Sequence, residues 1–559
     1  MSTDLPTDLL ARHRGRLDAA VAASASREFF SAFDESPSPR VYGEAAAADG
    51  KTAYEALLGG DFPLETPGTH DTVATERSPF GIDLGVRYPR VRPDGVDALM
   101  TAARAGMKAW RDAGPEGRTG ACLEILDRLH GRVFELANAV QHTSGQAFVM
   151  AFQAGGAHAL DRALEAIAYA WTEMTRTPAT ARWEKPGKVP LTMEKTYTVV
   201  PRGVALVIGC NTFPTWNSWP GLFASLVTGN PVVVKPHPAA VLPLAITVQA
   251  CREVLAEAGF DPNLVTLAAE DPADRLAAVL AVRPEVRLID FTGGNAFGDW
   301  LEENARQAVV FTEKAGVNTV VVDSTDNFRA MCQNLAFSFA LYTGQMCTAP
   351  QNVYLPSEGI GTEDGVKSPA EVAEGIGASL EKLLGEDARA VELLGGVVNE
   401  GVLERLDAAG SRGDVLVASR TVTHPAYPDA TVRTPTLIGL TASDTDVYET
   451  ECFGPVAYLI RTSGTTESID LFRDTVQRHG AMTASVYSTS DAVIADMREA
   501  SLDAGVALSE NLLGGVFVNQ SAAYSDFHGT GANPAATASY TDGAYVASRF
   551  RVVQSRRHV

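Results

Sequence analysis

The sequence has no apolar run that approaches the roughly 18–20 residues needed to cross a bilayer. Its N-terminal segment mixes acids with bases and lacks an apolar core followed by a small-residue cleavage site, so we do not expect it to act as a signal peptide. Positive charge is also sparse: 46 Lys and Arg stand against 68 Asp and Glu, which gives a net charge of −22. A field of this sign opposes nucleic acid and anionic membranes. We therefore expect a cytoplasmic protein that binds neither nucleic acid nor a membrane.

Cysteine is infrequent and follows no metal-binding pattern. The six cysteines form no C-x-x-C pair and have no metal-like spacing with histidine. Reduced thiols in a cytosolic protein fit this pattern, and we expect no metal centre. An isolated cysteine is more often a small buried apolar residue than a nucleophile, so a reactive thiol must be identified from its neighbours. The six are Cys122, Cys210, Cys251, Cys332, Cys347 and Cys452.

The chain of 559 residues is too long for one simple core, and two or three packed domains are expected. Residues 1–184 are predicted to be mostly helical, because apolar residues recur at helical spacing. From 202 to about 322, short β-branched runs alternate with amphipathic stretches, which is typical of a parallel sheet covered by helices on both faces. A second α/β region follows from about 324 to 520. The predicted strands of the first region are 204–209, 231–236, 264–269, 286–293 and 318–323.

Six short motifs follow the predicted strands or lie in the next region, where ligands bind to parallel sheets. Each motif is weak alone, because a strand-end lysine or glutamate usually faces water and a Gly-containing turn is a common strand-to-helix connection. In chain order they are GCNTFPTWNSWP with Asn211, VVVKP with Lys235, FTGGNAFG at 291–298, VFTEKAGVN with Glu313, YTGQMCTAP with Cys347, and ETECFGPV with Glu451 and Phe453.

This ordered series resembles the aldehyde dehydrogenase superfamily over about residues 197–519. In length and in its helical N-terminal part the chain is most similar to the PaaN-type enzymes of bacterial phenylacetate degradation. It is also similar to semialdehyde dehydrogenases that act on CoA-linked intermediates. The resemblance implies that Cys347 is the nucleophile, Glu313 the general base and Asn211 an oxyanion donor. It implies a nicotinamide cofactor whose ligands are Lys235, Gly293, Gly294, Gly298, Glu451 and Phe453.

The residue types suit these implied roles. A thiol of pKa about 8.5 is only a few per cent thiolate at neutral pH, and lowering its pKa to about 7 requires roughly 2 kcal/mol. Thiolate attack on an aldehyde leaves a negative oxygen, which the Asn211 amide and the Cys347 backbone N–H can stabilise. Loss of hydride then gives a thioester. Glu313 would deprotonate the water that hydrolyses it.

The implied architecture is an aldehyde dehydrogenase-like α/β fold with two Rossmann-like parallel-sheet domains and a small oligomerisation arm. The predicted cofactor-binding domain comprises residues 1–184 and 202–315, and the predicted catalytic domain residues 316–520. The predicted arm combines residues 185–201, which alternate like an extended hairpin, with residues 521–559. Exposed extended segments need a partner edge, and relatives use such an arm for assembly. We therefore expect a homodimer or a homotetramer.

The cofactor motif departs from the family at one position. The carboxylate that the family often places three residues after the lysine is Pro238 here. Loss of this anion removes a repulsion against a 2′-phosphate. The sequence therefore predicts NADP+, or dual use of NADP+ and NAD+, with Lys235 and His237 assisting.

Two further departures affect the substrate side. The family's Asn-Phe-Pro segment reads Asn-Thr-Phe-Pro here, one residue longer, which makes Asn217 a substitute candidate for the oxyanion amide. The family's Pro-Phe-Gly-Gly stretch near Asn519 is replaced by NQSAAYSDFHGTGANPAA, a region that shapes the substrate entrance in relatives. Four arginines near the C-terminus are interpreted either as contacts for CoA phosphates or as oligomer and surface charges. They are Arg549, Arg551, Arg556 and Arg557.

The leading hypothesis is oxidation of an aldehyde to a carboxylic acid, with a CoA-linked semialdehyde of aromatic-acid or phenylacetate degradation as the favoured substrate. The first alternative is a CoA-acylating aldehyde dehydrogenase, in which a thiol takes the acyl group. Relatives of that kind commonly lack a base at the Glu313 position, which argues against it. The second is a catalytically silent binding subunit, which the intact set of Cys347, Glu313 and Asn211 opposes.

Overall fold

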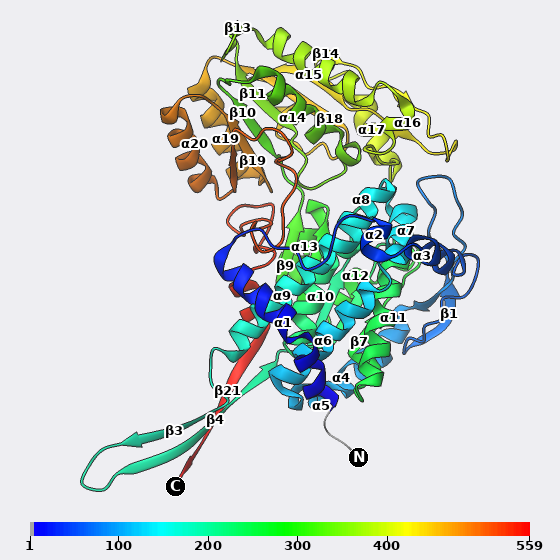
Figure 1. Ribbon diagram of the computed structural model, residues 1–559, viewed down its shortest axis with the longest axis vertical. Coiled ribbons are helices and arrows are strands. Elements are labelled where there is room, and N and C mark those ends of the chain that lie inside the picture. Colours follow the sequence, from blue (N-terminus) through cyan, green and yellow to red (C-terminus); the bar gives the residue numbers. More distant parts are fainter. Residues whose placement is uncertain (1–4) are drawn as a thin grey trace.

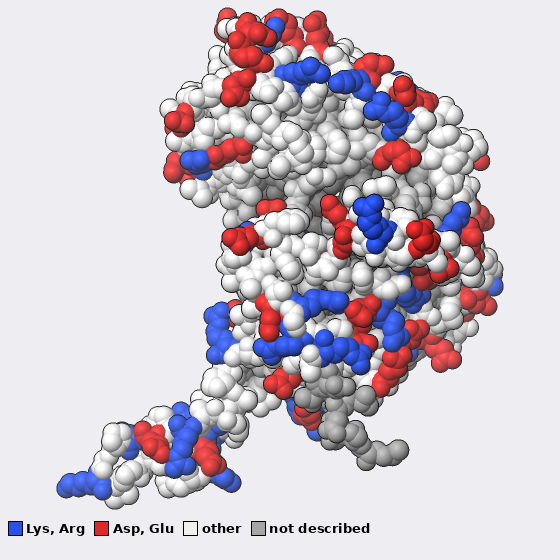
Figure 2. Space-filling view, viewed as in Figure 1, with Lys and Arg blue, Asp and Glu red and all other residues white. Residues whose placement is uncertain are grey.

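The computed structural model describes residues 5–559, which form two lobes and a projecting arm (Figure 1). The lower lobe contains a five-stranded sheet, the upper lobe a seven-stranded sheet, and the arm a three-stranded ribbon. The surface is recessed between the two lobes on the face drawn in Figure 2. Within the described residues, no helix combines the length and the apolar character that a membrane crossing requires.

The lower sheet is entirely parallel and has the strand order β7-β6-β5-β8-β9. All residues of its three strands β5, β6 and β7 are buried, because helices cover both faces and no alternation with polar residues is possible. Its strands are β5 (Val204–Ile208), β6 (Val232–Lys235), β7 (Val265–Leu267), β8 (Val286–Gly293) and β9 (Val309–Lys314).

Alternate residues of β5 point into two different cores. Ala205 and Val207 belong to a large core shared with one helical layer, whereas Leu206 and Ile208 belong to a second core on the opposite face. The first layer contains α1 (Leu5–Ser26), α6 (Gly114–His130), α9 (His158–Thr175), α10 (Pro214–Val227) and α11 (Leu242–Glu257). The second contains α4 (Val96–Ala105), α12 (Ala277–Ala281) and α13 (Asn295–Asn304).

The upper sheet has the order β14-β17-β18-β11-β10-β19-β20, and only the edge strand β14 runs antiparallel. Its strands are β10 (Thr319–Val322), β11 (Asn352–Pro356), β14 (Asp414–Val417), β17 (Thr436–Thr441), β18 (Val456–Thr462), β19 (Ala484–Tyr487) and β20 (Leu508–Glu510). The longer helices of this lobe are α14 (Phe328–Ala340), α15 (Pro369–Leu384), α17 (Glu400–Ala409), α19 (Thr465–His479) and α20 (Asp491–Ala504). The fold is thus the α/β architecture with parallel-sheet domains that the sequence predicts.

The arm consists of β3 (Thr180–Lys185), β4 (Leu191–Pro201) and β21 (Phe550–His558), all antiparallel. Its boundaries differ from the predicted ones at both ends. The hairpin already begins at β3, and the segment 521–549 does not join the arm, because Tyr524, Tyr540 and Tyr545 are buried in the lower-lobe core. Acidic and basic side chains are interspersed on the arm surface (Figure 2).

Arg549 occupies the junction between the lower lobe and β21. The sequence interpretation as a CoA contact or a surface charge is wrong for this residue, because its side chain is fully buried. Its guanidinium makes two hydrogen bonds to the Asp290 carboxylate of β8 (2.6 and 2.8 Å) and lies over the rings of Phe311 and Tyr545. Removal of one partner would leave the other charge buried, so this pair anchors the base of β21 to the sheet.

Candidate active site

The nucleophile candidate follows a strained turn after α14. Tyr342, Thr343 and Gly344 have positive φ values of 53°, 58° and 64°. A left-handed conformation costs a non-glycine residue about 1–2 kcal/mol, so the surroundings must hold the turn in place. The Thr343 hydroxyl donates to the carbonyl of Gly395 (2.9 Å) and accepts from its N–H (3.0 Å). These buried bonds fix the backbone a few residues before Cys347.

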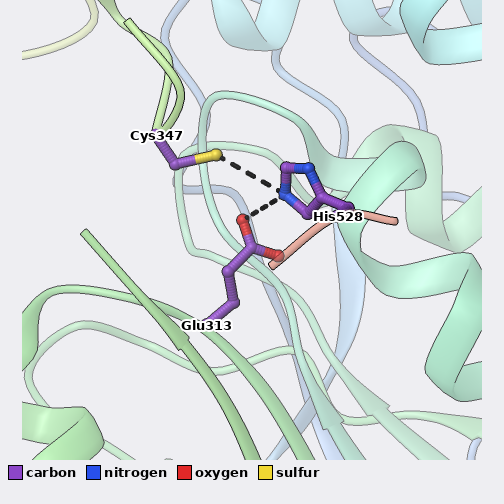
Figure 3. Close-up of side chains that lie close together, drawn as sticks. All are labelled: Glu313, Cys347 and His528. Carbon is purple, nitrogen blue, oxygen red and sulfur yellow. Dashed lines mark hydrogen bonds and ion pairs between the residues drawn. The ribbon is translucent and has the colours of Figure 1, made fainter. Parts of the chain in front are cut away.

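Cys347, Glu313 and His528 come together between the lobes (Figure 3). Nε2 of His528 lies 3.8 Å from Sγ of Cys347 and 3.0 Å from Oε1 of Glu313, a residue near the end of β9. Oε2 of Glu313 accepts a hydrogen bond from Nδ2 of Asn217 (2.9 Å). Asn217 therefore positions the carboxylate, a role that the sequence does not predict. The amide of Asn318 donates to the backbone carbonyl of Cys347 (2.7 Å) and holds the backbone of the turn in place.

The electrostatics of the two acidic groups differ. Burial acts to raise the pKa of Glu313, but the positive charge and the hydrogen bond of His528 outweigh it, and the pKa lies below its usual value. Burial, followed by the adjacent Glu313 carboxylate, raises the pKa of the Cys347 thiol. The thiol therefore needs a proton acceptor before it can act as a nucleophile.

Asn211 lies close to this turn through its chain neighbours. Phe213 packs edge-on against the ring of Tyr342, with ring centroids 5.5 Å apart. Oδ1 of Asn211 is buried and has no hydrogen-bond partner among the described residues, and an oxyanion would take its hydrogen bond from Nδ2 of the same amide. The backbone N–H of Cys347 likewise has no acceptor within residues 5–559. These two groups remain the candidates for binding a substrate oxyanion.

At the carboxyl end of β6, Lys235 makes a buried ion pair with Glu270, which follows the neighbouring strand β7. The second carboxylate oxygen of Glu270 accepts from the Leu276 N–H (2.6 Å). Pro238 and His237 lie in the loop after β6, where His237 is exposed to solvent. The sequence prediction of NADP+, or of dual use, rests on Pro238 alone. The structure adds a carboxylate from another segment, because Glu270 after the adjacent strand β7 lies on Lys235.

The glycine-containing segment after β8 leads into α13, which begins at Asn295. A Cβ on Gly294 would meet no atom within 4 Å, so the backbone there is open to a ligand. Gly298 has a different role from the predicted one. It is buried, and a Cβ on it would lie 2.6 Å from the Lys314 side chain, so it allows α13 to pack against β9. Gly293 ends β8 beside this helix N-terminus, whose free N–H groups favour anions.

A cavity of about 330 Å³ connects the start of α13 with the segment around Glu451, and Asn295, Lys314 and Glu451 contribute to its lining. Burial raises the pKa of Glu451 to about 7, and the positive charge of Arg405 partly opposes this effect. Arg405 also donates to the backbone carbonyl of Phe453 (2.9 Å). The cavity thus has a helix N-terminus, which favours anions, on one side and a half-buried acid on the other.

Sequence reasoning missed two residues of this site, His528 and Glu270. Glu270 directly follows a predicted strand, so the carboxyl-end rule offered it as a candidate alongside Lys235, whose role came from the family resemblance. His528 lies in the segment NQSAAYSDFHGTGANPAA, whose departure from the family pattern was the available signal. Its approach to Glu313 joins positions 215 residues apart, and no local pattern predicts such a contact.

Comparison with known proteins agrees with this geometry. The model of the aldehyde dehydrogenase family matches residues 67–519. The chain is 25% identical to a vanillin dehydrogenase of Pseudomonas fluorescens over 430 residues, which cover 75% of this chain and 82% of that protein. It is 24% identical to a 3,4-dehydroadipyl-CoA semialdehyde dehydrogenase of Aromatoleum evansii over 440 residues, covering 74% and 81% of the two chains. The crystal structure of an NAD-dependent aldehyde dehydrogenase from Burkholderia multivorans matches with a TM-score of 0.97 and 57% identity, covering 99% of each chain.

Proposed function

The chain belongs to the aldehyde dehydrogenase family, and we propose that it oxidises a semialdehyde to a carboxylic acid through a thioester on Cys347. The observation that carries this proposal is the placement of a partly exposed thiol beside a buried, ionised Glu313. A nucleophile and a base within one small space are what a reaction with two carbonyl-level steps requires.

In the first step the Cys347 thiolate attacks the aldehyde carbon, and the new C–S bond leaves a negative oxygen. The Asn211 amide and the Cys347 N–H stabilise this oxygen, each donor contributing about 2.7–4 kcal/mol in a dry site. In the last step Glu313 takes a proton from water, and the hydroxide attacks the thioester. The C–S bond then breaks and releases the acid. Asn217 holds the carboxylate in place for this transfer.

The residues fit a nicotinamide dinucleotide. Open backbone at Gly294 and the N-terminus of α13 suit its pyrophosphate, and the cavity toward Glu451 and Phe453 suits its nicotinamide riboside. When bound, the cofactor accepts the hydride that converts the thiohemiacetal on Cys347 into the thioester. Lys235 would hold the second ribose.

NAD+ is the proposed acceptor, in place of the NADP+ that the sequence predicts. The buried carboxylate of Glu270 on Lys235 supports this choice, because it can accept a hydrogen bond from a ribose hydroxyl and repels a 2′-phosphate. The similarity to the NAD-dependent enzyme from Burkholderia multivorans points the same way.

The proposed substrate is a CoA-linked semialdehyde of aromatic-acid degradation, as in a PaaN-type enzyme. Support comes from the names of two similar proteins. One is a vanillin dehydrogenase, and the other is a dehydrogenase of a CoA-linked semialdehyde. Arg549 is unavailable to CoA phosphates because it is buried on Asp290. Any CoA contact must therefore come from other residues.

Water is the proposed acyl acceptor. The hydrogen bonds that hold Glu313 support hydrolysis over transfer to a thiol, because an acyl transfer to CoA needs no base for water. The three-stranded arm supports a homodimer or homotetramer, since β3 and β21 each leave one strand edge unpaired within residues 5–559.

The test offers the enzyme free aromatic aldehydes, free aliphatic aldehydes and CoA-linked semialdehydes, with NAD+ or NADP+ and without added CoA. We expect reduced cofactor and free acid, the highest kcat/KM for a CoA-linked semialdehyde with NAD+, and loss of activity by about 10³-fold or more in Cys347→Ala. Substantial activity in Cys347→Ala would refute the mechanism. A strict requirement for CoA would instead identify the acylating alternative.

A further inference from the structure

His528 lies between the two reactive groups of the site. It is 4% exposed and comes from the segment between the upper lobe and the arm. The ring of Trp216 packs against its imidazole at a centroid distance of 4.6 Å, which restricts the ring orientation. One nitrogen, Nε2, faces both Sγ of Cys347 and Oε1 of Glu313 (Figure 3).

A thiolate on Cys347 and the carboxylate of Glu313 would repel each other unless a positive group lay beside them. A Cys347 thiolate would place a second negative charge within a few ångströms of the Glu313 carboxylate, in a buried space where like charges repel strongly. The other titratable groups that act on this pair, Cys210, Tyr540 and Glu451, are neutral or negative. Of the groups that face the pair in residues 5–559, His528 is the one that becomes positive on protonation.

Direct transfer of the thiol proton to Glu313 would not serve both steps. It would produce a thiolate beside a neutral carboxylic acid, and the acid could not then take a proton from water. Storing the proton elsewhere keeps Glu313 ionised. His528 offers the acceptor nitrogen at the required place.

We propose that His528 is a catalytic residue that accepts the Cys347 proton and holds the site as a thiolate–imidazolium–carboxylate triad. The transfer breaks the S–H bond, leaves its electron pair on sulfur and forms the Nε2–H bond. The same N–H then donates to Sγ and to Oε1 of Glu313. When the thioester is hydrolysed, sulfur leaves as a thiolate next to the imidazolium, and the proton that Glu313 took from water passes to solvent.

This inference rests on the proposed role of Cys347, but its test needs neither an aldehyde nor a cofactor. Iodoacetamide alkylates thiolates, and Cys347 is the partly exposed cysteine while the other five are buried. The rate of Cys347 alkylation is measured against pH, with the labelled peptide identified by mass spectrometry. If the enzyme oxidised no aldehyde, the proposed function would fail while this profile could still show the triad.

The informative variant is His528→Gln, which can keep a hydrogen bond to Glu313 but cannot take a proton. We expect alkylation at neutral pH to slow by about 10- to 100-fold, with the profile shifted to alkaline pH, because one to two pKa units change the thiolate fraction by that factor. The control is His13→Gln, which removes another buried histidine that bonds a glutamate, Glu124 (2.8 Å), and should leave the profile unchanged.

A His528→Gln profile that superimposes on the wild-type profile would overturn the proposal and leave Glu313 as the thiol base. If His528→Gln does not fold, the wild-type enzyme still gives an answer by ultraviolet absorption of the thiolate, with Cys347→Ser as the blank. The triad predicts thiolate absorption already on the acidic side of neutrality. Absorption that rises only at alkaline pH contradicts it.

Discussion

The five-stranded sheet carries a buried glutamate at each of its two edges, and their partners separate their roles. Glu313 near the end of β9 and Glu270 after β7 are 1% and 5% exposed. Glu313 bonds to the imidazole of His528, whereas Glu270 bonds to the ammonium of Lys235. Burial lowers the pKa of Lys235, and the Glu270 carboxylate opposes this effect. The first carboxylate thus lies beside the candidate nucleophile, and the second holds a candidate cofactor ligand in place. The same residue type, at the carboxyl end of each edge strand, thus serves chemistry or positioning according to its partner.

Of the substitutions considered, Glu313→Gln should have the largest effect on catalysis. The amide cannot take a proton from water, so steady-state turnover should fall by about 10²–10⁴-fold. A burst of reduced cofactor close to one per active site should remain, because acylation of Cys347 does not need this base. Rapid-mixing measurements of the burst and the steady state check this.

The matched control is Glu303→Gln, an exposed glutamate of α13, which should change neither phase. Loss of the burst together with the steady state would show that Glu313 acts before the thioester forms. Full steady-state turnover in Glu313→Gln would remove it from the mechanism.

Glu270→Gln should affect binding and leave the order of chemical steps intact. Replacement of the carboxylate by an amide weakens the interaction with a ribose hydroxyl and removes the repulsion of a 2′-phosphate. The preference for NADH over NADPH should therefore fall by roughly 10-fold, which corresponds to about 1.4 kcal/mol. Fluorescence titration of both reduced cofactors measures the two Kd values directly.

Glu253→Gln, which changes an exposed acid on α11, provides the control for that titration. An unchanged ratio of the two Kd values in Glu270→Gln would exclude Glu270 as the selecting residue. A wild-type preference for NADPH would instead support the prediction that Pro238 permits binding of a 2′-phosphate.

The smallest expected effect concerns stability in acid. The pKa of Glu313 in the folded protein lies below the unfolded value of 4.5, so its ionised form stabilises the fold above that pH. The contribution is lost as pH falls through the folded-state pKa. The free energy of unfolding should therefore decrease more steeply below pH 4.5 in the wild type than in Glu313→Gln. Urea denaturation curves of both proteins, recorded at several pH values in this range, measure the difference. The same dependence of the unfolding free energy on pH in both proteins would contradict it.

The local pattern predicted most strands as short β-branched runs, but it placed the run 318–323 in the first region, whereas β10 lies in the upper sheet. The carboxyl-end rule made Lys235 and Glu313 candidates, and the resemblance to the aldehyde dehydrogenase family gave them their roles. The same rule missed Glu270, because the family pattern directed attention to Pro238 after a different strand. His528 depends on a contact between distant segments, and the limit of the arm depends on aromatic packing and on the Arg549–Asp290 pair. These features arise from tertiary structure, which spacing along the chain does not reveal.

The anchoring of β21 has a mechanical consequence. Its inner end is clamped by Arg549 to Asp290 on β8, and β8 is the neighbour of the strand that carries Glu313. A load applied along the projecting ribbon would therefore reach β8, the strand next to the one that carries the base. If subunits assemble through the ribbon, as proposed, assembly and the alignment of the reacting groups would depend on the same buried ion pair.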